Sequence, residues 1–362
     1  MKRLVSLDFF RGLTIALMII VNCPGSWSSV YPPLRHADWH GVTPTDLVFP
    51  FFLFIVGVSI ALAYAGKKQS GSVSRSAYLK IVKRSLIIFG LGLFLALFPK
   101  FNFAELRVVG VLQRIALVFC FCAILYLKTS WRTQFYVGVA CLLGYYIVMC
   151  FVPFGSSVAG TLDPGDNFAA WVDQYITPGR MYRETWDPEG FFSTIPAFGN
   201  GIAGLLVGRI ILDKKKSSHV KIIWIFAAGL VCFLIGYMWD YIFPANKHIW
   251  TSSYVMITSG LAALCLAASM WFIDEQGYKK WTKLGVVFGM NAITAYVLHS
   301  VLLRLFWIPI SGDQSIQKLW MSGLTSIGIA PQLVSFLWAL TYMLFIYLIV
   351  LVLYRKKIFI KV

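Results

Sequence analysis

Long apolar runs recur along this chain and constrain its fold more than any other feature. Each run holds about 20 residues, which is enough to cross a hydrocarbon layer of roughly 30 Å as a helix. Because the interior of a bilayer offers backbone groups no water, only helices or closed barrels can span it. Hydrophobic residues make up 59% of the 362 residues and charged residues only 13%. We therefore predict an all-α polytopic membrane protein with a single domain over residues 1–362.

The expected helices form a bundle of about ten transmembrane spans. Sequence patterns place such spans better than they place their ends, so each boundary is expected to within a few residues. The spans cover residues 4–22, 46–65, 82–98, 108–127, 133–152, 191–212, 221–243, 252–273, 284–307 and 331–354.

Lys and Arg are concentrated in alternate connecting segments, which indicates how the spans are oriented. One set of segments holds 21 of these residues, among them Lys2, Arg3 and Lys361, and the other set holds seven. Because cytoplasmic segments retain positive charge during insertion, we expect both termini in the cytoplasm. The net charge of +17 then serves mainly to set topology, so we expect no nucleic-acid binding. Attraction of membrane lipids or an anionic cofactor to the inner face stays open.

Two substantial loops, residues 23–45 and 153–190, fall on the outer face. Both are rich in aromatic and acidic residues, including the stretch "RETWDPEG". Aromatic rings stack on sugar rings, and carboxylates accept hydrogen bonds from hydroxyls and amines, so this composition suits a polar or cationic ligand. The alternative is an aromatic belt at the membrane interface.

Several ionisable residues lie at the expected membrane depth, where a charge costs on the order of 3 kcal/mol. Asp8 and Arg11 are three residues apart, so a pair within one helix explains them as well as a function does. Arg209 and Arg304 lie near span ends, where their side chains can reach the headgroups. Arg114 lies deeper and is a stronger functional candidate.

A second polar pair lies in the expected span over residues 284–307. His299 follows Asn291 by eight residues, which places both on one face of a continuous helix. Hydrogen bonding between packed helices is the alternative to a functional role.

The stretch "RHADWHG" in the first outer loop gathers the chain's densest titratable chemistry. His36, Asp38, His40 and Asp46 supply two bases and two carboxylates, and Asn22 ends the first span. A histidine can take up and return a proton near neutral pH, and it works best when a carboxylate orients its ring.

Three alternatives to a catalytic role stay open for this stretch. Asp46 could serve only as a helix cap, because "TPTD" is typical of a capping box with proline in the first turn. The pattern His-x-Asp-x-His could hold a metal, but it lacks a recognised fourth ligand, and we expect none. A histidine in an exposed loop can also have no role.

Eight ordered blocks give the chain a resemblance to a known family. It resembles a bacterial-type member of the heparan-alpha-glucosaminide N-acetyltransferase family, polytopic enzymes that move acetyl from cytosolic acetyl-CoA to an amino sugar across a membrane. The blocks are "DFFRG", "VN", "RHADWHG", "TDLVFPFFLFIVGVSI", "GVLQRIAL", "WDPEGFFSTIPA", "NKHIWTSSYV" and "GMNAITAYVLH".

The resemblance implies roles for particular residues. The family's catalytic histidine, in a His-Ala-x-Trp-x-Gly setting, falls on His36, and its preceding asparagine falls on Asn22. We predict His36, Asn22 and Asp46 as catalytic residues. The expected cofactor-binding residues, for acetyl-CoA, are Arg114, Asn291 and His299. The expected substrate-binding residues are Asp38, His40, Trp186, Asp187, Glu189 and Asn246.

The chain departs from the lysosomal members at the acceptor side. The lysosomal members are similar to this chain but have asparagine at the position of His40 and serine at that of Asp38. They also carry an additional N-terminal segment. The acceptor is therefore expected to differ. The resemblance implies a multi-pass protein of the bacterial inner membrane, with a small amino sugar or a glycan end as acceptor.

The expected function is transmembrane acetyl transfer from cytoplasmic acetyl-CoA to an amino sugar on the outer, periplasmic face. His36 would act as a general base or as a transient acetyl carrier. A transporter of amino sugars or cell-wall sugars without chemistry is the alternative, and transfer to an envelope polymer is a third. Whether the chain acts alone or as a homodimer stays open.

Overall fold

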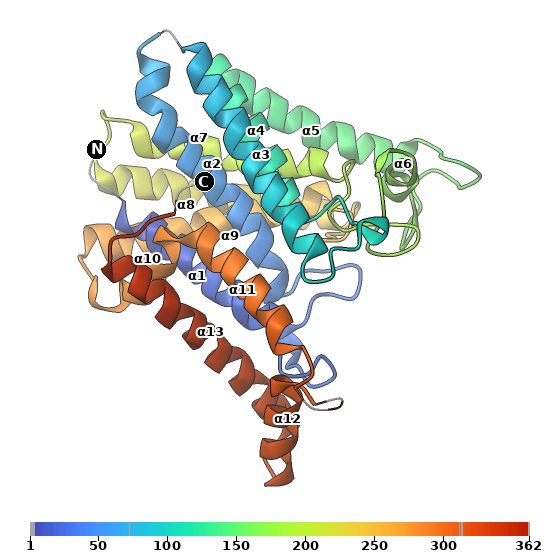
Figure 1. Cartoon of the computed structure of the whole chain (residues 1–362). Helices are drawn as coiled ribbons and strands as arrows, with labels where there is room; N and C mark the ends of the chain where they lie inside the picture. Colours follow the sequence, from blue (N-terminus) through green and yellow to red (C-terminus); the bar gives the residue numbers. More distant parts are fainter. Residues whose placement is uncertain (1–3, 72, 311, 313, 361–362) are drawn as a thin grey trace. The chain divides into compact units, whose positions relative to one another are not determined.

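Helices make up almost all of the regular structure (Figure 1). The computed structural model describes residues 4–71, 73–310, 312 and 314–360. Within these residues it contains thirteen α-helices, and the one sheet is an antiparallel hairpin of β1 (Leu162–Asp163) and β2 (Asp166–Asn167). Three basic residues assigned to the inner face, Lys2, Arg3 and Lys361, lie outside the described residues.

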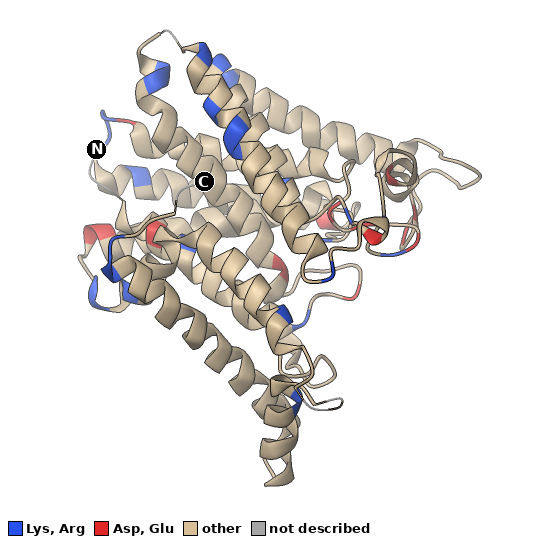
Figure 2. Cartoon of the chain, in the orientation of Figure 1, with Lys and Arg blue, Asp and Glu red and all other residues tan. Residues whose placement is uncertain are grey.

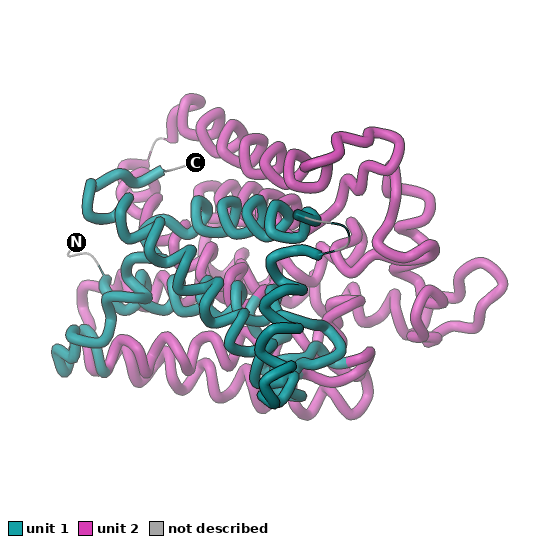
Figure 3. The backbone as a smooth tube through the Cα atoms, turned by 60° about the horizontal axis from the view of Figure 1, so that its bottom comes forward, with its two compact units in different colours: residues 1–37, 43–48, 272–362 teal, residues 38–42, 49–271 magenta. Residues whose placement is uncertain are grey.

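The chain folds as two compact units, coloured separately in Figure 3. Unit 1 comprises residues 1–37, 43–48 and 272–362, and unit 2 comprises residues 38–42 and 49–271. The expectation of a single domain over residues 1–362 stays a prediction. Unit 1 contains α1 (Val5–Asn22), α10 (Lys283–Met290), α11 (Ala292–Phe306), α12 (Ile316–Ser326) and α13 (Pro331–Arg355), with the 3-10 turns η1 (Pro32–Leu34), η2 (Pro44–Leu47) and η5 (Lys280–Thr282).

Unit 2 contains the middle helices of the chain. Apart from the first residue of α2, these are α2 (Val48–Gln69), α3 (Arg75–Leu97), α4 (Val111–Lys128), α5 (Trp131–Phe151), α6 (Phe168–Ile176), α7 (Thr194–Leu212), α8 (Ser218–Asp240) and α9 (Ser252–Ser269). A 3-10 turn, η3 (Phe103–Glu105), lies between α3 and α4, and a π-helical turn over Met270–Glu275 follows α9.

The all-α polytopic class is confirmed. In the described part of the chain, eight helices are long and apolar enough to cross a membrane, or nine if a bent pair counts as one span. The remaining expected span, residues 82–98, falls on α3, which is 23 residues long but carries Arg75, Lys80, Lys83 and Arg84. Figure 2 shows these charges in its N-terminal half.

The expected continuous span over residues 284–307 is broken. α10 and α11 meet at an angle of 75°, and Asn291 between them leaves the helical conformation. Its side-chain amide donates to the carbonyl of Ile358 and accepts from the backbone N–H of Ile360, both at 3.2 Å. Asparagine competes with the helix for backbone hydrogen bonds, which explains the break. The expectation that Asn291 and His299 lie on one face of a continuous helix is therefore wrong.

Glycines let α1 and α10 pack with their backbones in direct contact. A Cβ at Gly12 would lie 1.7 Å from the carbonyl oxygen of Gly285 and 2.6 Å from the nitrogen of Gly289. A methyl group cannot fit at such distances. Small residues commonly allow this close approach between membrane helices, where van der Waals packing replaces the hydrophobic effect.

We predict that Gly12→Ala destabilises the protein by about 1–3 kcal/mol, because α1 and α10 must move apart. Thermal unfolding in detergent measures the effect. Gly323→Ala in α12 is the matched control, since no heavy atom lies within 4 Å of the place its methyl group would take and alanine favours helix. Equal melting temperatures for both variants would show that the close packing of α1 on α10 contributes nothing.

Candidate active site

His36 and Asp46 form the closest match to the expected catalytic pair. The Nδ1 atom of His36 lies 2.6 Å from Oδ1 of Asp46. The carboxylate is buried, with its side chain 1% exposed, whereas the histidine side chain is 32% exposed. An ionised carboxylate can only accept, so this contact favours the tautomer of the neutral ring that carries its proton on Nδ1 and its lone pair on Nε2. That tautomer is the one a general base requires.

The backbone around Asp46 holds its carboxylate in place. Its second oxygen, Oδ2, accepts hydrogen bonds from the backbone N–H groups of Ala37 at 3.1 Å and Thr43 at 3.0 Å. Thr43 and Asp46 also form the expected capping box at the start of η2. Asp46 therefore both caps this turn and orients the ring of His36, and its catalytic role stays a prediction.

Asn22 and Asp38 are not joined to this pair by any hydrogen bond in the described residues. Asn22 is the last residue of α1 and is exposed. Asp38 is also exposed, and it belongs to unit 2. Their assigned roles stay predictions.

Three rings in unit 2 pack together around Trp186. The rings of Trp39 and His248 are stacked 5.2 Å apart, and Trp186 lies edge-on to both, at 5.1 Å from Trp39 and 5.2 Å from His248. The indole N–H of Trp39 donates to the carbonyl of Leu162. All three rings are only half-buried. We call Trp39, Trp186 and His248 the aromatic cluster.

His40 lies next to the segment that carries this cluster. Its Nδ1 is 3.4 Å from the side-chain nitrogen of Asn246. The Asn246 oxygen accepts from the backbone of His248 and Ile249, so this residue shapes the turn. Partial burial lowers the pKa of His40, and the negative charges of Asp163 and Asp240 raise it in part.

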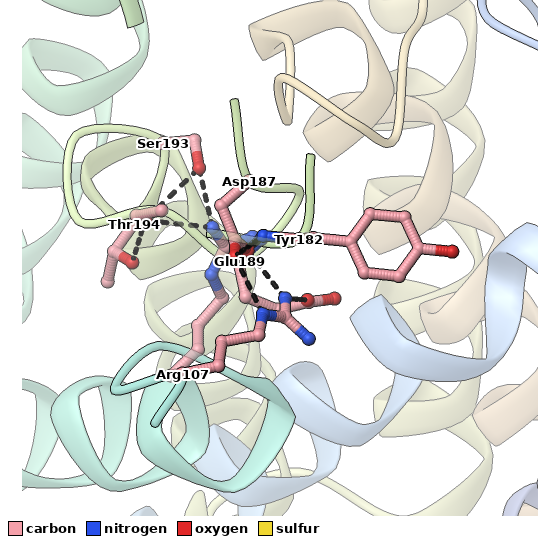
Figure 4. A network of polar contacts seen from close by, with 8 residues as sticks. Arg107, Tyr182, Asp187, Glu189, Ser193 and Thr194 are labelled. Carbon is pink, nitrogen blue, oxygen red and sulfur yellow. Dashed lines mark hydrogen bonds and ion pairs between the residues drawn. The ribbon is translucent and has the colours of Figure 1, made fainter. Parts of the chain in front are cut away.

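Arg107 binds the two carboxylates that were expected to contact substrate (Figure 4). It donates to both oxygens of Asp187, at 2.6 and 2.5 Å, and also pairs with Glu189. Asp187 accepts further from the backbone of Tyr182 at 2.8 Å. Burial opposes the charge on Arg107, but the hydrogen bonds and charges of its two partners outweigh this and raise its pKa. We call Arg107, Asp187 and Glu189 the arginine latch.

The latch explains how Trp186 is positioned. Asp187 directly follows it, and the side chain of Asp187 is completely buried. A bidentate arginine–carboxylate pair fixes both distance and orientation. Substrate contact by Asp187 or Glu189 stays a prediction, since both carboxylates are engaged by Arg107.

Arg114 lies in the first turn of α4 and is 1% exposed. Its Nη2 donates to the carbonyl of Gly190 at 3.0 Å and to the Ser193 hydroxyl at 2.5 Å. Its guanidinium lies 4.8 Å from the ring of Trp250. The Nε and Nη1 atoms, although buried, have no hydrogen-bond partner among the described residues. These donors fit an acceptor oxygen of a ligand.

Asp173 of α6 holds the segment around Gly190, which Arg114 also contacts. Its Oδ1 accepts from the backbone N–H of Phe192 at 3.0 Å. A Cβ on Gly190 would lie 1.8 Å from its other oxygen, so only glycine fits there. Burial raises the pKa of Asp173 to about 6, against the opposing hydrogen bond from Phe192 and the charge of Arg114.

This shift predicts a pH dependence of stability. Because the folded carboxyl holds its proton more tightly than the unfolded one, the stability it contributes is greatest below pH 4 and is lost as the pH rises through about 6. Asp173→Asn should remove this part of the dependence, on the order of 2 kcal/mol between pH 4.5 and 7.5. Melting curves at several pH values test it, with exposed Asp38→Asn as control. Parallel profiles for native protein and Asp173→Asn would contradict it.

The other two predicted cofactor-binding residues, Asn291 and His299, lie in unit 1 and contact other residues of that unit. Asn291 holds the C-terminal segment through Ile358 and Ile360. The Nδ1 of His299 lies 3.3 Å from the sulfur of Cys23, and the Tyr342 hydroxyl donates to the His299 carbonyl at 2.7 Å. The structure does not bring Asn291 and His299 into contact with the same partners.

Arg107, Asp173 and His248 were missed as site residues. Arg107 and Asp187 are 80 residues apart in the chain, so no local spacing relates them. The sequence did contain one indication of a role for Arg107. It is among only seven basic residues assigned to the outer face, so its charge there suggests an acidic partner.

Comparison with known proteins identifies the family. A model of the family described as heparan-alpha-glucosaminide N-acetyltransferase, catalytic, matches residues 3–238, more than half of the chain. The chain belongs to this family. The resemblance drawn from the eight blocks is thereby confirmed, and the chain is a membrane protein of an acetyltransferase family.

Two curated relatives are similar over nearly the whole chain. Heparan-alpha-glucosaminide N-acetyltransferase of Homo sapiens is 28% identical over 99% of this chain, and that of Mus musculus is 26% identical over 100%. The chain spans 60% of the length of the human relative and 61% of the mouse one.

Proposed function

We propose that the chain transfers an acetyl group from acetyl-CoA to the amino group of an amino sugar, with His36 as general base or acetyl carrier. The observation that carries this is the bond between His36 Nδ1 and the buried carboxylate of Asp46. A half-exposed histidine held by a buried carboxylate can act as a base or as a nucleophile, and acyl transfer uses both kinds of group.

Two routes use this pair. In direct transfer, His36 Nε2 takes the proton of the attacking amine as the new C–N bond forms. The C–S bond of the thioester breaks, and the proton passes to the leaving thiolate. In two-step transfer, Nε2 attacks the thioester carbon, the C–S bond breaks and CoA leaves as the thiolate. The amine then attacks the acetyl-imidazole, the bond between Nε2 and the acetyl carbon breaks, and the amine proton passes through Nε2 to the thiolate. Asp46 stabilises the positive charge on the imidazole ring in both routes.

The aromatic cluster supports a sugar as acceptor. Its half-buried tryptophans offer apolar ring faces, and His40 and Asn246 beside them offer polar groups. The nearby carboxylates of Asp163 and Asp240 favour a cationic ligand such as a protonated amine.

Acetyl-CoA, which the family implies, supplies the activated acetyl thioester. Among the predicted cofactor-binding residues, Arg114 has buried donors that fit an acceptor oxygen. Asn291 and His299 contribute polar groups that are engaged within unit 1. The proposed sidedness, with donor from the cytoplasm and acceptor outside, is supported by the distribution of basic residues along the sequence.

Transport without chemistry is the second candidate, and the break between α10 and α11 favours it. Discontinuous helices form the substrate and ion sites of many transporters. The His36–Asp46 pair favours transfer, because uptake alone requires no oriented base.

One pair of assays separates the two functions. Purified protein in detergent is incubated with labelled acetyl-CoA and a panel of amino sugars, and free CoA and acetylated sugar are quantified. Sealed vesicles containing the protein are tested in parallel for sugar accumulation. Acetylated product in detergent supports transfer and identifies the acceptor. Accumulation of unmodified sugar without CoA release would mean that the chain is a transporter.

A further inference from the structure

A cavity of about 350 Å³ opens in unit 1, among side chains that were assigned no role in the proposed reaction. It lies where the start of α1, the start of α10 and the end of α13 come together. Its lining consists of Val5, Asp8, Lys279, Thr282, Lys283, Val286 and Tyr354.

The cavity has an excess of positive charge. Lys279 and Lys283 make no ion pair within the part of the chain that the structure describes. The one carboxylate in the lining, Asp8, pairs with Arg11 at 3.2 Å, so its charge is already compensated. Asp274 nearby in the chain accepts a hydrogen bond from the backbone of Ser6. Two lysines are therefore left to attract an anion.

The segment that carries these lysines also exposes aromatic residues of the kind found at a membrane–water interface. Tyr278 is 63% exposed and Trp281 is 89% exposed, although both are large aromatic residues. Tyrosine and tryptophan are enriched at the level of lipid headgroups. Figure 2 shows further basic residues at the end of α13, where Arg355, Lys356 and Lys357 follow Tyr354.

We propose that this cavity binds a phosphate group, with Lys279 and Lys283 as its ligands and Tyr354 beside them. The volume admits a phosphate with part of the group it is attached to. Two sources share this chemistry. One is the headgroup of an anionic lipid, which the exposed aromatic residues favour. The other is the nucleotide end of CoA, and this second source rests on the proposed function.

Charge-removing variants test the site. The double variant Lys279→Gln/Lys283→Gln is compared with Lys280→Gln, because Lys280 is an exposed neighbour that does not line the cavity. Binding of phosphatidylglycerol to the purified full chain is measured by native mass spectrometry. Binding of adenosine 3′,5′-bisphosphate is measured by calorimetry. Melting temperatures check that all variants fold.

The expected result is a Kd at least about tenfold higher in the double variant for one of the two probes, and a Kd in Lys280→Gln within about twofold of native. A loss for the lipid alone assigns the site to a headgroup, and a loss for the nucleotide alone assigns it to CoA. The proposal is overturned if neither probe loses affinity, or if Lys280→Gln loses as much, since that would reflect general surface charge.

Acetyl transfer is assayed on the same preparations. If native protein fails to transfer acetyl but the double variant still loses phosphate binding, the proposed function fails and the phosphate site stands. If native protein transfers acetyl and the double variant binds both probes normally, the proposed function stands and the phosphate site fails.

Discussion

Asp46→Asn should lower kcat for acetyl transfer by about 10²–10⁴-fold, with KM for acetyl-CoA and amine changed by less than about threefold. Asp46 Oδ1 accepts the Nδ1 proton of His36 at 2.6 Å. An asparagine can present its N–H₂ there instead, which stabilises the other tautomer and removes the lone pair from Nε2. Steady-state kinetics with both substrates varied measure the effect.

Structural damage must be separated from this loss, because Asp46 also caps η2. Thr43→Val weakens the same cap while leaving the carboxylate on His36, so it should lower stability by about 1 kcal/mol and retain most of the native kcat. A pH–rate profile adds a readout that a cap alone would not move, since the ascending limb that reports the base should shift in Asp46→Asn. Native kcat in Asp46→Asn would remove the pair from the mechanism.

Arg107→Met should destabilise the protein by about 3–5 kcal/mol. The variant removes the cation from the buried side chain of Asp187 and from Glu189, and it leaves two carboxylates without compensation. Methionine keeps much of the apolar stem. Thermal or denaturant unfolding of the purified protein measures the change.

The chain offers a matched control for this prediction. Arg180 pairs with Glu105 at 3.9 Å, and both side chains are about two-thirds exposed. Arg180→Met should therefore cost less than about 1 kcal/mol. Neutralising the carboxylates as well, in Arg107→Met with Asp187→Asn and Glu189→Gln, should recover part of the stability. If Arg107→Met unfolds at the same temperature as Arg180→Met, the ion pairs of Arg107 with Asp187 and Glu189 do not stabilise the protein.

Hydropathy predicted the helices well, because the energy that fixes a membrane span depends on local composition. The expected spans 4–22 and 331–354 agree closely with α1 (Val5–Asn22) and α13 (Pro331–Arg355). The break at Asn291 was missed, since an apolar stretch long enough to span says nothing about a bend within it. Asn291 turns the chain because the C-terminal segment supplies its partners, and that contact is not local.

The contact between two of the predicted site residues follows from their closeness in sequence, whereas their catalytic role stays a prediction. His36 and Asp46 are ten residues apart and share a hydrogen bond, and the capping box with Thr43 holds the carboxylate of Asp46 in place. The aromatic cluster joins Trp39, Trp186 and His248 from three distant segments, and only Trp186 was selected for a role. Asp187 and Glu189 were expected to face substrate, because a sequence does not reveal that Arg107 neutralises them.

Acetyl transfer through His36 is tested by comparing native protein, His36→Ala and His40→Ala with labelled acetyl-CoA and glucosamine. His40 is the matched control, since it is a second histidine of the same loop and its Nδ1 faces Asn246 at 3.4 Å instead of a carboxylate. We expect equal amounts of free CoA and N-acetylated sugar from native protein, a kcat for His40→Ala within about tenfold of native, and no product from His36→Ala. Transfer by His36→Ala at the native rate, or no CoA release by native protein with any amino sugar, would contradict acetyl transfer through His36.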